Sequence, residues 1–139
     1  MKTKAIISIK SSQGQSDEEP ISIVTPGTFY ERNNTFYAVY EETEISGMKG
    51  TTTTIKIRPS EFLLLRTGTT NARMHFRKND KNASMYDTPY GTLQLEIETT
   101  ELNINVNEEG GNIYVNYDMT VSGQKVMPTF LEIDIKIVE

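Results

Sequence analysis

Apolar and polar residues alternate with a period of two along most of this chain. The alternation is clearest in four segments of the C-terminal half, at residues 93–97, 102–106, 113–121 and 131–137. Side chains of a β-strand point to opposite faces in turn, so this period indicates strands with one buried face and one solvated face. No segment of helical length shows an apolar period of 3.6 residues. The chain is therefore expected to fold as an all-β protein.

Length and composition narrow the class of protein further. A length of 139 residues predicts one domain, spanning residues 1–139. There is no cysteine, which excludes disulfides, thiolate metal sites and cysteine nucleophiles. The apolar run before Lys10 is too short for a signal peptide or a membrane span. We therefore expect a cytoplasmic protein that does not associate with membranes.

The spacing of the strands favours a barrel. About ten short strands joined mostly by hairpins predict a single antiparallel up-and-down β-barrel of about 8–10 strands, with a sandwich as the alternative. A barrel is favoured because closure hides the edge strands. The apolar phase slips by one residue between Ile97 and Leu102 without a glycine or a proline, which predicts a bulge in a continuing strand. Another strand is expected to run from Thr35 to Glu44.

Two hairpins have registers that can be derived from their turn residues. The first is the hairpin around Gly110-Gly111. If these glycines form a two-residue turn, Val106 lies opposite Val115 and every apolar residue of the two strands falls on one face. This agreement predicts that Tyr117 points into the barrel.

The second hairpin carries the candidate binding site. With a turn at Thr69-Thr70, Arg66 lies directly opposite Arg73. Facing arginines are unfavourable unless a negative group lies between them, and two guanidinium groups suit a carboxylate or a phosphate. The alternative is that both arginines lie solvated on the outer face, which the apolar opposite face favours. Tyr117 joins the candidate ligand-binding residues, since an inward tyrosine needs a polar partner or a wet cavity. Tyr86 is the fourth candidate.

Charge is unevenly distributed along the chain. The net charge is −5, yet seven basic residues and only two acidic residues lie between Lys56 and Lys81. Such a stretch can mark an anion-binding face, but ordinary surface strands whose charges keep the protein soluble are the favoured interpretation. We do not expect nucleic acid as the partner, because only Phe62 and Phe76 are available in this stretch to stack on bases.

The chemistry-bearing residues do not form a catalytic or metal-binding pattern. His75 is the only histidine, and its strand neighbours Arg73 and Arg77 are basic, whereas the residue that orients a catalytic imidazole is acidic. A single histidine also excludes a histidine-rich metal site. The acidic residues of 41–44 and 96–101 are expected to face solvent. We therefore expect no cofactor, no metal and no enzymatic activity.

A set of short motifs in the middle of the chain resembles a known family. The motifs are Arg66-Thr67-Gly68, Met74-His75-Phe76 and Tyr86-Asp87-Thr88-Pro89-Tyr90-Gly91, followed by Thr99. In combination they resemble the YwiB-like family of uncharacterised bacterial proteins, over nearly the whole chain. The resemblance implies a calycin-like β-barrel, the architecture of lipocalins and fatty-acid-binding proteins, and it implies no established activity. The chain departs from those better-known relatives because it has no tryptophan and no helical pair to cap the barrel.

Two functions remain open at the level of sequence. The first is the binding of a small anionic or amphipathic molecule in the barrel or at its mouth. The alternative is a protein or nucleic-acid interaction module that uses the basic outer face around residues 56–81. Either function is compatible with a monomer or a homodimer.

Overall fold

The chain folds into one closed antiparallel barrel. The computed structural model describes residues 2–13, 20–125 and 128–138, which contain eleven β-strands and one turn of 3-10 helix, η1. The elements are β1 (Thr3–Gln13), β2 (Ile21–Arg32), β3 (Thr35–Glu41), η1 (Glu44–Ser46), β4 (Thr51–Ile57), β5 (Glu61–Gly68), β6 (Asn71–Arg77), β7 (Lys81–Thr88), β8 (Gly91–Asn107), β9 (Gly110–Val121), β10 (Gln124–Lys125) and β11 (Thr129–Ile137). Strands β1 to β9 and β11 form the wall, since β8 pairs with β9, β9 with β11 and β11 with β1. Among the residues that the structure describes, the two-residue β10 pairs only with the end of β9.

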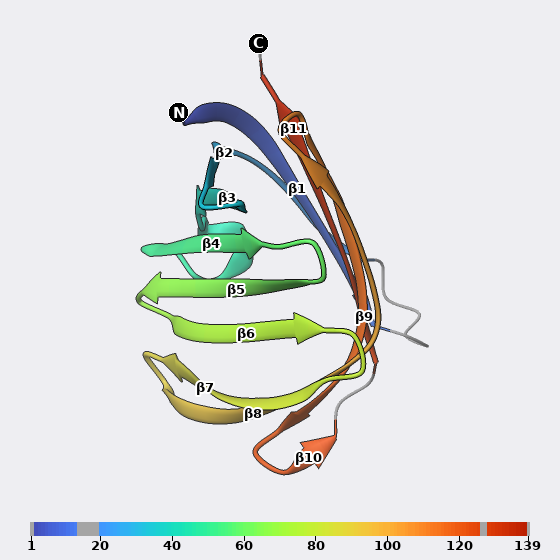
Figure 1. The fold of residues 1–139 in the computed structure, drawn as a ribbon. Coiled ribbons are helices and arrows are strands. Elements are labelled where there is room, and N and C mark those ends of the chain that lie inside the picture. The colour runs from blue at the N-terminus through green and yellow to red at the C-terminus, as the bar shows by residue number, and fades with distance from the viewer. Residues whose placement is uncertain (1, 14–19, 126–127, 139) are drawn as a thin grey trace.

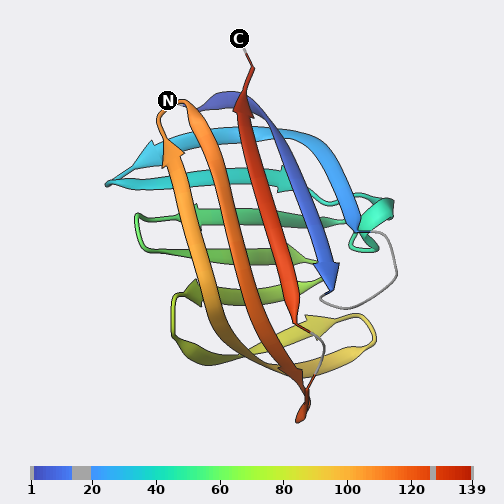
Figure 2. The same ribbon diagram turned by 90° about the vertical axis from the view of Figure 1, so that its right-hand side faces the viewer.

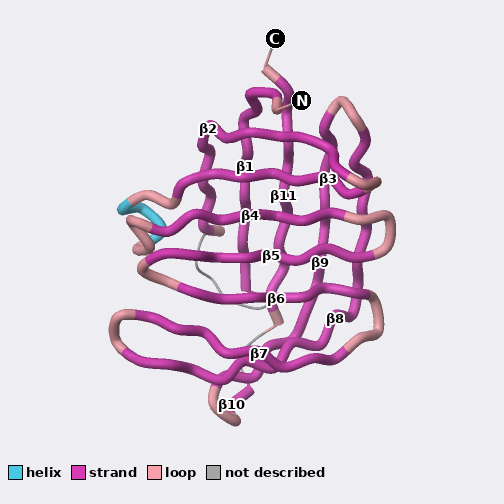
Figure 3. The backbone as a smooth tube through the Cα atoms, turned by 60° about the vertical axis from the view of Figure 1, so that its left-hand side comes forward, coloured by secondary structure: helices cyan, strands magenta, loops and turns pink. Residues whose placement is uncertain are grey.

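The barrel is flattened into two walls whose strands cross. Figure 1 shows β4 to β8 stacked as one wall, and β1, β9 and β11 running across them as the other. Figure 2, turned to face the second wall, shows the C-terminal part of β8 lying beside β9, β11 and β1. The η1 segment, the β5–β6 turn and the β7–β8 turn lie at one end of the first wall (Figure 3). These connections build the end of the barrel where the cavities described below are found.

A bulge lets β8 pass from one wall to the other. The register of the β8–β9 pair shifts between Thr99 and Glu101, inside a strand that continues from Gly91 to Asn107. A bulge of this kind bends a strand sharply and increases its local twist. The bulge predicted from the phase slip is therefore confirmed, and the closed barrel is the architecture observed.

The β8–β9 hairpin has a different register from the one predicted. Asn107 pairs with Gly110, so the turn is Glu108-Glu109, and Val106 lies opposite Gly111. The register predicted from a Gly110-Gly111 turn is therefore wrong, since it placed Val115 opposite Val106, four residues further along β9. Because four is an even number, the same side chains still face inward, and the predicted inward face is correct. The two glycines have positive φ angles of 99° and 142° inside the strand, and a side chain at either would overlap a backbone carbonyl. They mark a close approach of strands, where a chain normally needs glycine.

The β5–β6 hairpin is shifted by one residue, and this shift changes the candidate site. Arg66 pairs with Ala72, and Leu65 pairs with Arg73. A shift of one residue exchanges the two faces of a strand, so Arg66 lies inside the barrel with Leu64, and Arg73 lies outside. The predicted facing of Arg66 and Arg73 is wrong.

The local cause of this shift is the connection after Arg66. Gly68 has a φ of 132°, and Asn71 braces the turn by accepting from the Gly68 amide at 3.3 Å and donating to its carbonyl at 3.0 Å. Five residues, 67–71, lie between the paired Arg66 and Ala72, whereas the predicted pairing of Arg66 with Arg73 leaves six, so the register differs by one residue.

Strand β3 ends three residues earlier than predicted. The Glu42 amide still donates to the Thr51 carbonyl at 2.8 Å, but the Thr43 hydroxyl then accepts from the Ile45 amide and begins η1. Gly47, with a φ of 76°, ends the turn. Within the described residues, no helix is long and apolar enough to cross a membrane.

Apolar side chains from every wall fill much of the barrel. Phe62 and Phe76 are fully buried and stack with ring centroids 4.6 Å apart, and Phe76 meets the ring of Tyr117 at 4.9 Å. The other largest fully buried apolar side chains are Ile7, Ile55, Ile57, Ile97, Ile113, Val115 and Ile133. Burying each such side chain stabilises the fold by roughly 2 kcal/mol. Phe62 and Phe76 are therefore unavailable to stack on nucleic-acid bases.

Candidate ligand cavity

A cavity of about 240 Å³ lies inside the barrel, near the end that carries η1. Its wall includes apolar side chains of β1, β5, β6 and β11 and four polar or sulfur-containing ones that concern the chemistry: Tyr40, Glu42, Met48 and Arg66. A second cavity of about 280 Å³ is lined mainly by apolar residues of β7, β8 and β9. Arg66, Met74 and Tyr117 line both cavities, so these side chains stand where the two meet.

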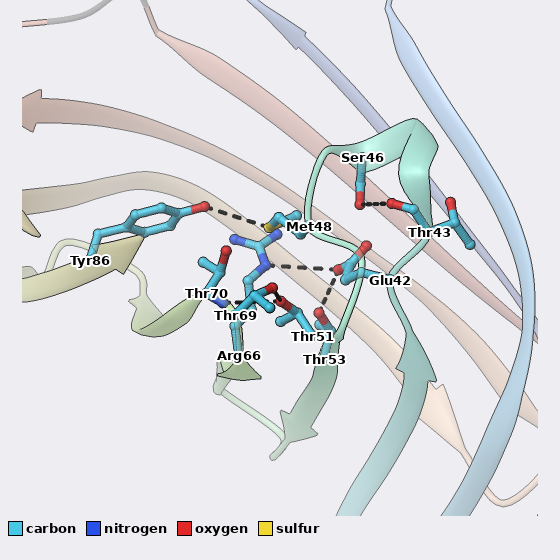
Figure 4. Close-up of polar contacts among 10 residues, drawn as sticks. All are labelled: Glu42, Thr43, Ser46, Met48, Thr51, Thr53, Arg66, Thr69, Thr70 and Tyr86. Atoms are coloured by element: carbon cyan, nitrogen blue, oxygen red, sulfur yellow. Dashed lines mark hydrogen bonds and ion pairs between the residues drawn. The ribbon is translucent and has the colours of Figure 1, made fainter. Parts of the chain in front are cut away.

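Arg66 is the central charged group of this site. Its side chain is only 17% exposed, because β5 directs it into the barrel. The nearest carboxylate oxygen is Oε2 of Glu42, at 3.8 Å from the Arg66 Nε. This distance is too long for a hydrogen bond, and the buried Nε has no hydrogen-bond partner among the described residues. Figure 4 shows the terminal nitrogens of Arg66 pointing past Glu42, toward Met48 and Tyr86.

Glu42 is the counter-charge to Arg66. It follows β3 and continues the inward set of that strand, so its side chain is only 2% exposed. The Thr53 hydroxyl donates to the Glu42 Oε2 at 2.5 Å (Figure 4). Sequence reasoning placed Glu42 with its acidic neighbours on the solvated face, and this placement is wrong. The signal that could have identified it is its even number, which Glu42 shares with the inward Ala38 and Tyr40.

Threonine hydroxyls hold the turn beside the pair. The Thr51 and Thr69 hydroxyls lie 2.9 Å apart, and the Thr69 hydroxyl is also 2.9 Å from the Lys49 carbonyl. The Thr70 amide donates to the Thr51 hydroxyl at 3.1 Å. These bonds tie the β5–β6 turn to the start of β4, so the strand that carries Arg66 and the segment that carries Glu42 have a defined relative position.

Two tyrosines share the interior with this ion pair. Burial, reinforced by the Glu42 carboxylate, raises the pKa of Tyr40 well above the usual tyrosine value, and Arg66 opposes the shift. Burial also raises the pKa of Tyr117, while Arg66 and a hydrogen bond to Thr129 lower it in part. Both side chains are therefore neutral hydroxyl groups at ordinary pH, able to donate and accept hydrogen bonds.

The raised pKa values predict a loss of stability in alkali. Above about pH 10 the unfolded chain releases tyrosine protons that folded Tyr40 and Tyr117 retain, so the free energy of unfolding falls as the pH rises. The slope approaches about 1.4 kcal/mol per pH unit for each buried tyrosine. Urea unfolding at a series of pH values measures it. Tyr117→Phe removes one of the two groups, and its slope is expected to be shallower; a slope equal to that of the unaltered protein would contradict the prediction.

The structure gathers some of the sequence-predicted residues and separates others. Arg66, Tyr86 and Tyr117 all line the second cavity. The Tyr86 hydroxyl lies 3.6 Å from the Met48 sulfur, beside the terminal nitrogens of Arg66 (Figure 4). Arg73 lies exposed on the outer face of the barrel, away from this group. Glu42 and Met48 are members of the group that sequence reasoning missed.

His75 has an acidic neighbour that was not foreseen. Its Nε2 lies 3.2 Å from the Glu61 carboxylate, on the outer face of the barrel. The pair is partly exposed and stands apart from both cavities. Among the described residues, no group of three or more His, Cys, Asp or Glu side chains is arranged to hold a metal ion.

Comparison with known proteins places the barrel in a family. The chain is 27% identical over 114 residues to the uncharacterized beta-barrel protein YwiB of Bacillus subtilis (strain 168), covering 81% of this chain and 78% of that protein. The crystal structure of the ywiB protein from Bacillus subtilis superposes with a TM-score of 0.84 at 23% identity, covering 99% of this chain and 94% of the other. The model of the domain of unknown function DUF1934 matches residues 7–133. The chain therefore belongs to the DUF1934 family of YwiB-like β-barrel proteins.

Proposed function

We propose that this barrel binds a small amphipathic molecule, with an anionic or strongly hydrogen-bond-accepting group on Arg66. The observation that carries the proposal is the state of the Arg66 side chain. It is largely buried, its Nε lacks a hydrogen-bond partner among the described residues, and it faces two cavities. A buried donor without an acceptor costs about 1–3 kcal/mol, so an occupant that supplies acceptors recovers that free energy. The planar fork of a guanidinium suits a carboxylate or a phosphate.

The rest of the cavity explains why the occupant is amphipathic. Leu64, Met74 and Leu131 line the first cavity next to Arg66, so an apolar group of the ligand would be removed from water there. At the roughly 30 Å³ that one water molecule occupies in the liquid, a cavity of about 240 Å³ holds about eight non-hydrogen atoms. This is below the usual range of drug-sized pockets, so the ligand is a small one.

Binding of 4-methylpentanoate tests the proposal. This probe carries one carboxylate and a short branched chain of suitable size. Arg66→Lys keeps a positive charge beside Glu42 but removes the two-pronged donor, so we expect binding to weaken about tenfold, corresponding to about 1.4 kcal/mol. Isothermal titration calorimetry, supported by native mass spectrometry of the complex, measures the change.

The matched control is Arg73→Lys. Arg73 lies on the neighbouring strand, but its side chain is on the outer face of the barrel, so this control makes the same chemical change outside the cavity. We expect binding of 4-methylpentanoate to be unchanged. Equal affinities of Arg66→Lys and Arg73→Lys for 4-methylpentanoate, or no binding of any carboxylate probe to the unaltered protein, would contradict the proposed function.

A further inference from the structure

The charges that line the two cavities cancel. Arg66 is the only basic residue of their described lining and Glu42 the only acidic one. Both side chains are at least four-fifths removed from solvent. An additional charge without a partner is costly at such a place, because the surrounding dielectric is low. A plain carboxylate bound to Arg66 would leave the group of three charges with a net charge of −1.

A ligand with its own positive charge would avoid this cost. Glu42 and Arg66 lie side by side, with Oε2 and Nε 3.8 Å apart. An ammonium group and a carboxylate attached to one carbon atom are a similarly close pair of opposite charges. Such a ligand can place its carboxylate on Arg66 and its ammonium group toward Glu42, so that the four charges sum to zero.

The second cavity supplies room for an apolar side chain. Leu93, Leu95, Met119 and Val121 line it, and it meets the first cavity at Arg66. A substituent on the carbon that carries both charged groups would therefore enter an apolar space directly beside the ion pair. Polar partners remain on the other side, where Tyr40 and Ser46 line the first cavity.

From this arrangement we infer that the ligand is a zwitterionic α-amino acid with an apolar side chain. The inference rests on the proposed function and specifies its ligand class. In this arrangement Arg66 binds the carboxylate, Glu42 accepts from the ammonium group, and the second cavity takes the side chain.

Three probes that carry the same branched alkyl chain test the inference on the unaltered protein. L-leucine carries both charges, 4-methylpentanoate lacks the ammonium group, and 3-methylbutylamine lacks the carboxylate. Isothermal titration calorimetry is expected to give L-leucine an affinity at least about tenfold higher than that of 4-methylpentanoate, since a buried charge-assisted hydrogen bond is added. No binding of 3-methylbutylamine is expected. This comparison needs no variant and is therefore independent of any effect on folding.

Glu42→Gln gives a second and distinctive readout. The amide retains the shape of the side chain and an acceptor for the Thr53 hydroxyl, but removes the negative charge. L-leucine is expected to lose its advantage in this variant, whereas 4-methylpentanoate is expected to bind at least as tightly as before, because the repulsion from Glu42 is gone. A merely structural role of Glu42 would weaken both probes together.

The possible failures are distinguishable. If 4-methylpentanoate binds the unaltered protein as tightly as L-leucine and Arg66→Lys weakens both, the amino-acid inference is wrong and the proposed function stands. If L-leucine keeps its advantage in Glu42→Gln, the inference is also wrong. If none of the three probes binds, both the inference and the proposed function are wrong.

Discussion

Glu42→Met is expected to lower the free energy of unfolding by about 3 kcal/mol, because it leaves a buried guanidinium without its counter-charge. The side chains of Glu42 and Arg66 are 2% and 17% exposed, and their nearest charged atoms lie 3.8 Å apart. Methionine has nearly the size of glutamate, so the change removes the charge without opening a large cavity. Urea unfolding followed by circular dichroism measures the effect.

The double variant Glu42→Met/Arg66→Met measures how strongly Glu42 and Arg66 are coupled in the free energy of unfolding. Replacing both partners of a buried ion pair by apolar side chains is often nearly neutral, so the double variant is expected to lie within about 1 kcal/mol of the unaltered protein. The remaining cost is the Thr53 hydroxyl, which donates to Glu42 and would lose its acceptor. If the double variant is as unstable as the sum of the two single variants, Arg66 and Glu42 are not energetically coupled.

Gly111→Ala is expected to destabilise the barrel by about 4 kcal/mol, through two effects that add. Gly111 has a φ of 142°, a backbone conformation that costs alanine roughly 1–3 kcal/mol. A Cβ atom at this position would also overlap the Asn105 carbonyl of the paired strand. Since the obstacle is backbone, relief requires the β8–β9 ladder to shift, which adds about 1–3 kcal/mol.

Gly91→Ala is the matched control for the backbone term. Gly91 has a φ of 133°, close to that of Gly111, but a Cβ atom there would meet nothing within 4 Å. Its expected cost is therefore the conformational term alone, about 1–3 kcal/mol, without the added cost of a displaced strand. Equal losses at Gly91 and Gly111, measured by the same urea titration, would contradict the argument that Gly111 is required for close approach of β8 and β9.

Several parts of the fold could be predicted because they depend on local chemistry. The period-two alternation identified the strands and their inward faces, as for Ile113 and Val115 in β9. The bulge near Thr99 was visible as a slip in the alternation, because a one-residue insertion exchanges the faces of a strand.

The candidate site could not be predicted in the same way, since it depends on register. Two registers that differ by one residue have nearly the same local sequence signal at Thr69-Thr70. They nevertheless place Arg66 on opposite sides of the wall. The choice between them depends on the Gly68–Asn71 turn and on the pairing of β5 with β4 on its other edge. The alternation of apolar and polar residues records neither of these contacts.

The amino-acid sequence by itself determined that this chain forms about ten antiparallel strands with one apolar face each, because strand geometry translates a period of two directly into faces. Only the tertiary structure decided that Arg66 and Glu42 meet inside the barrel while Arg73 lies outside it. The physical reason is that burial of a single charged residue costs free energy. The alternation of apolar and polar residues, which treats each residue by itself, therefore assigns every charged residue to the surface. Burial of a charge becomes acceptable only when folding brings its partner from another strand.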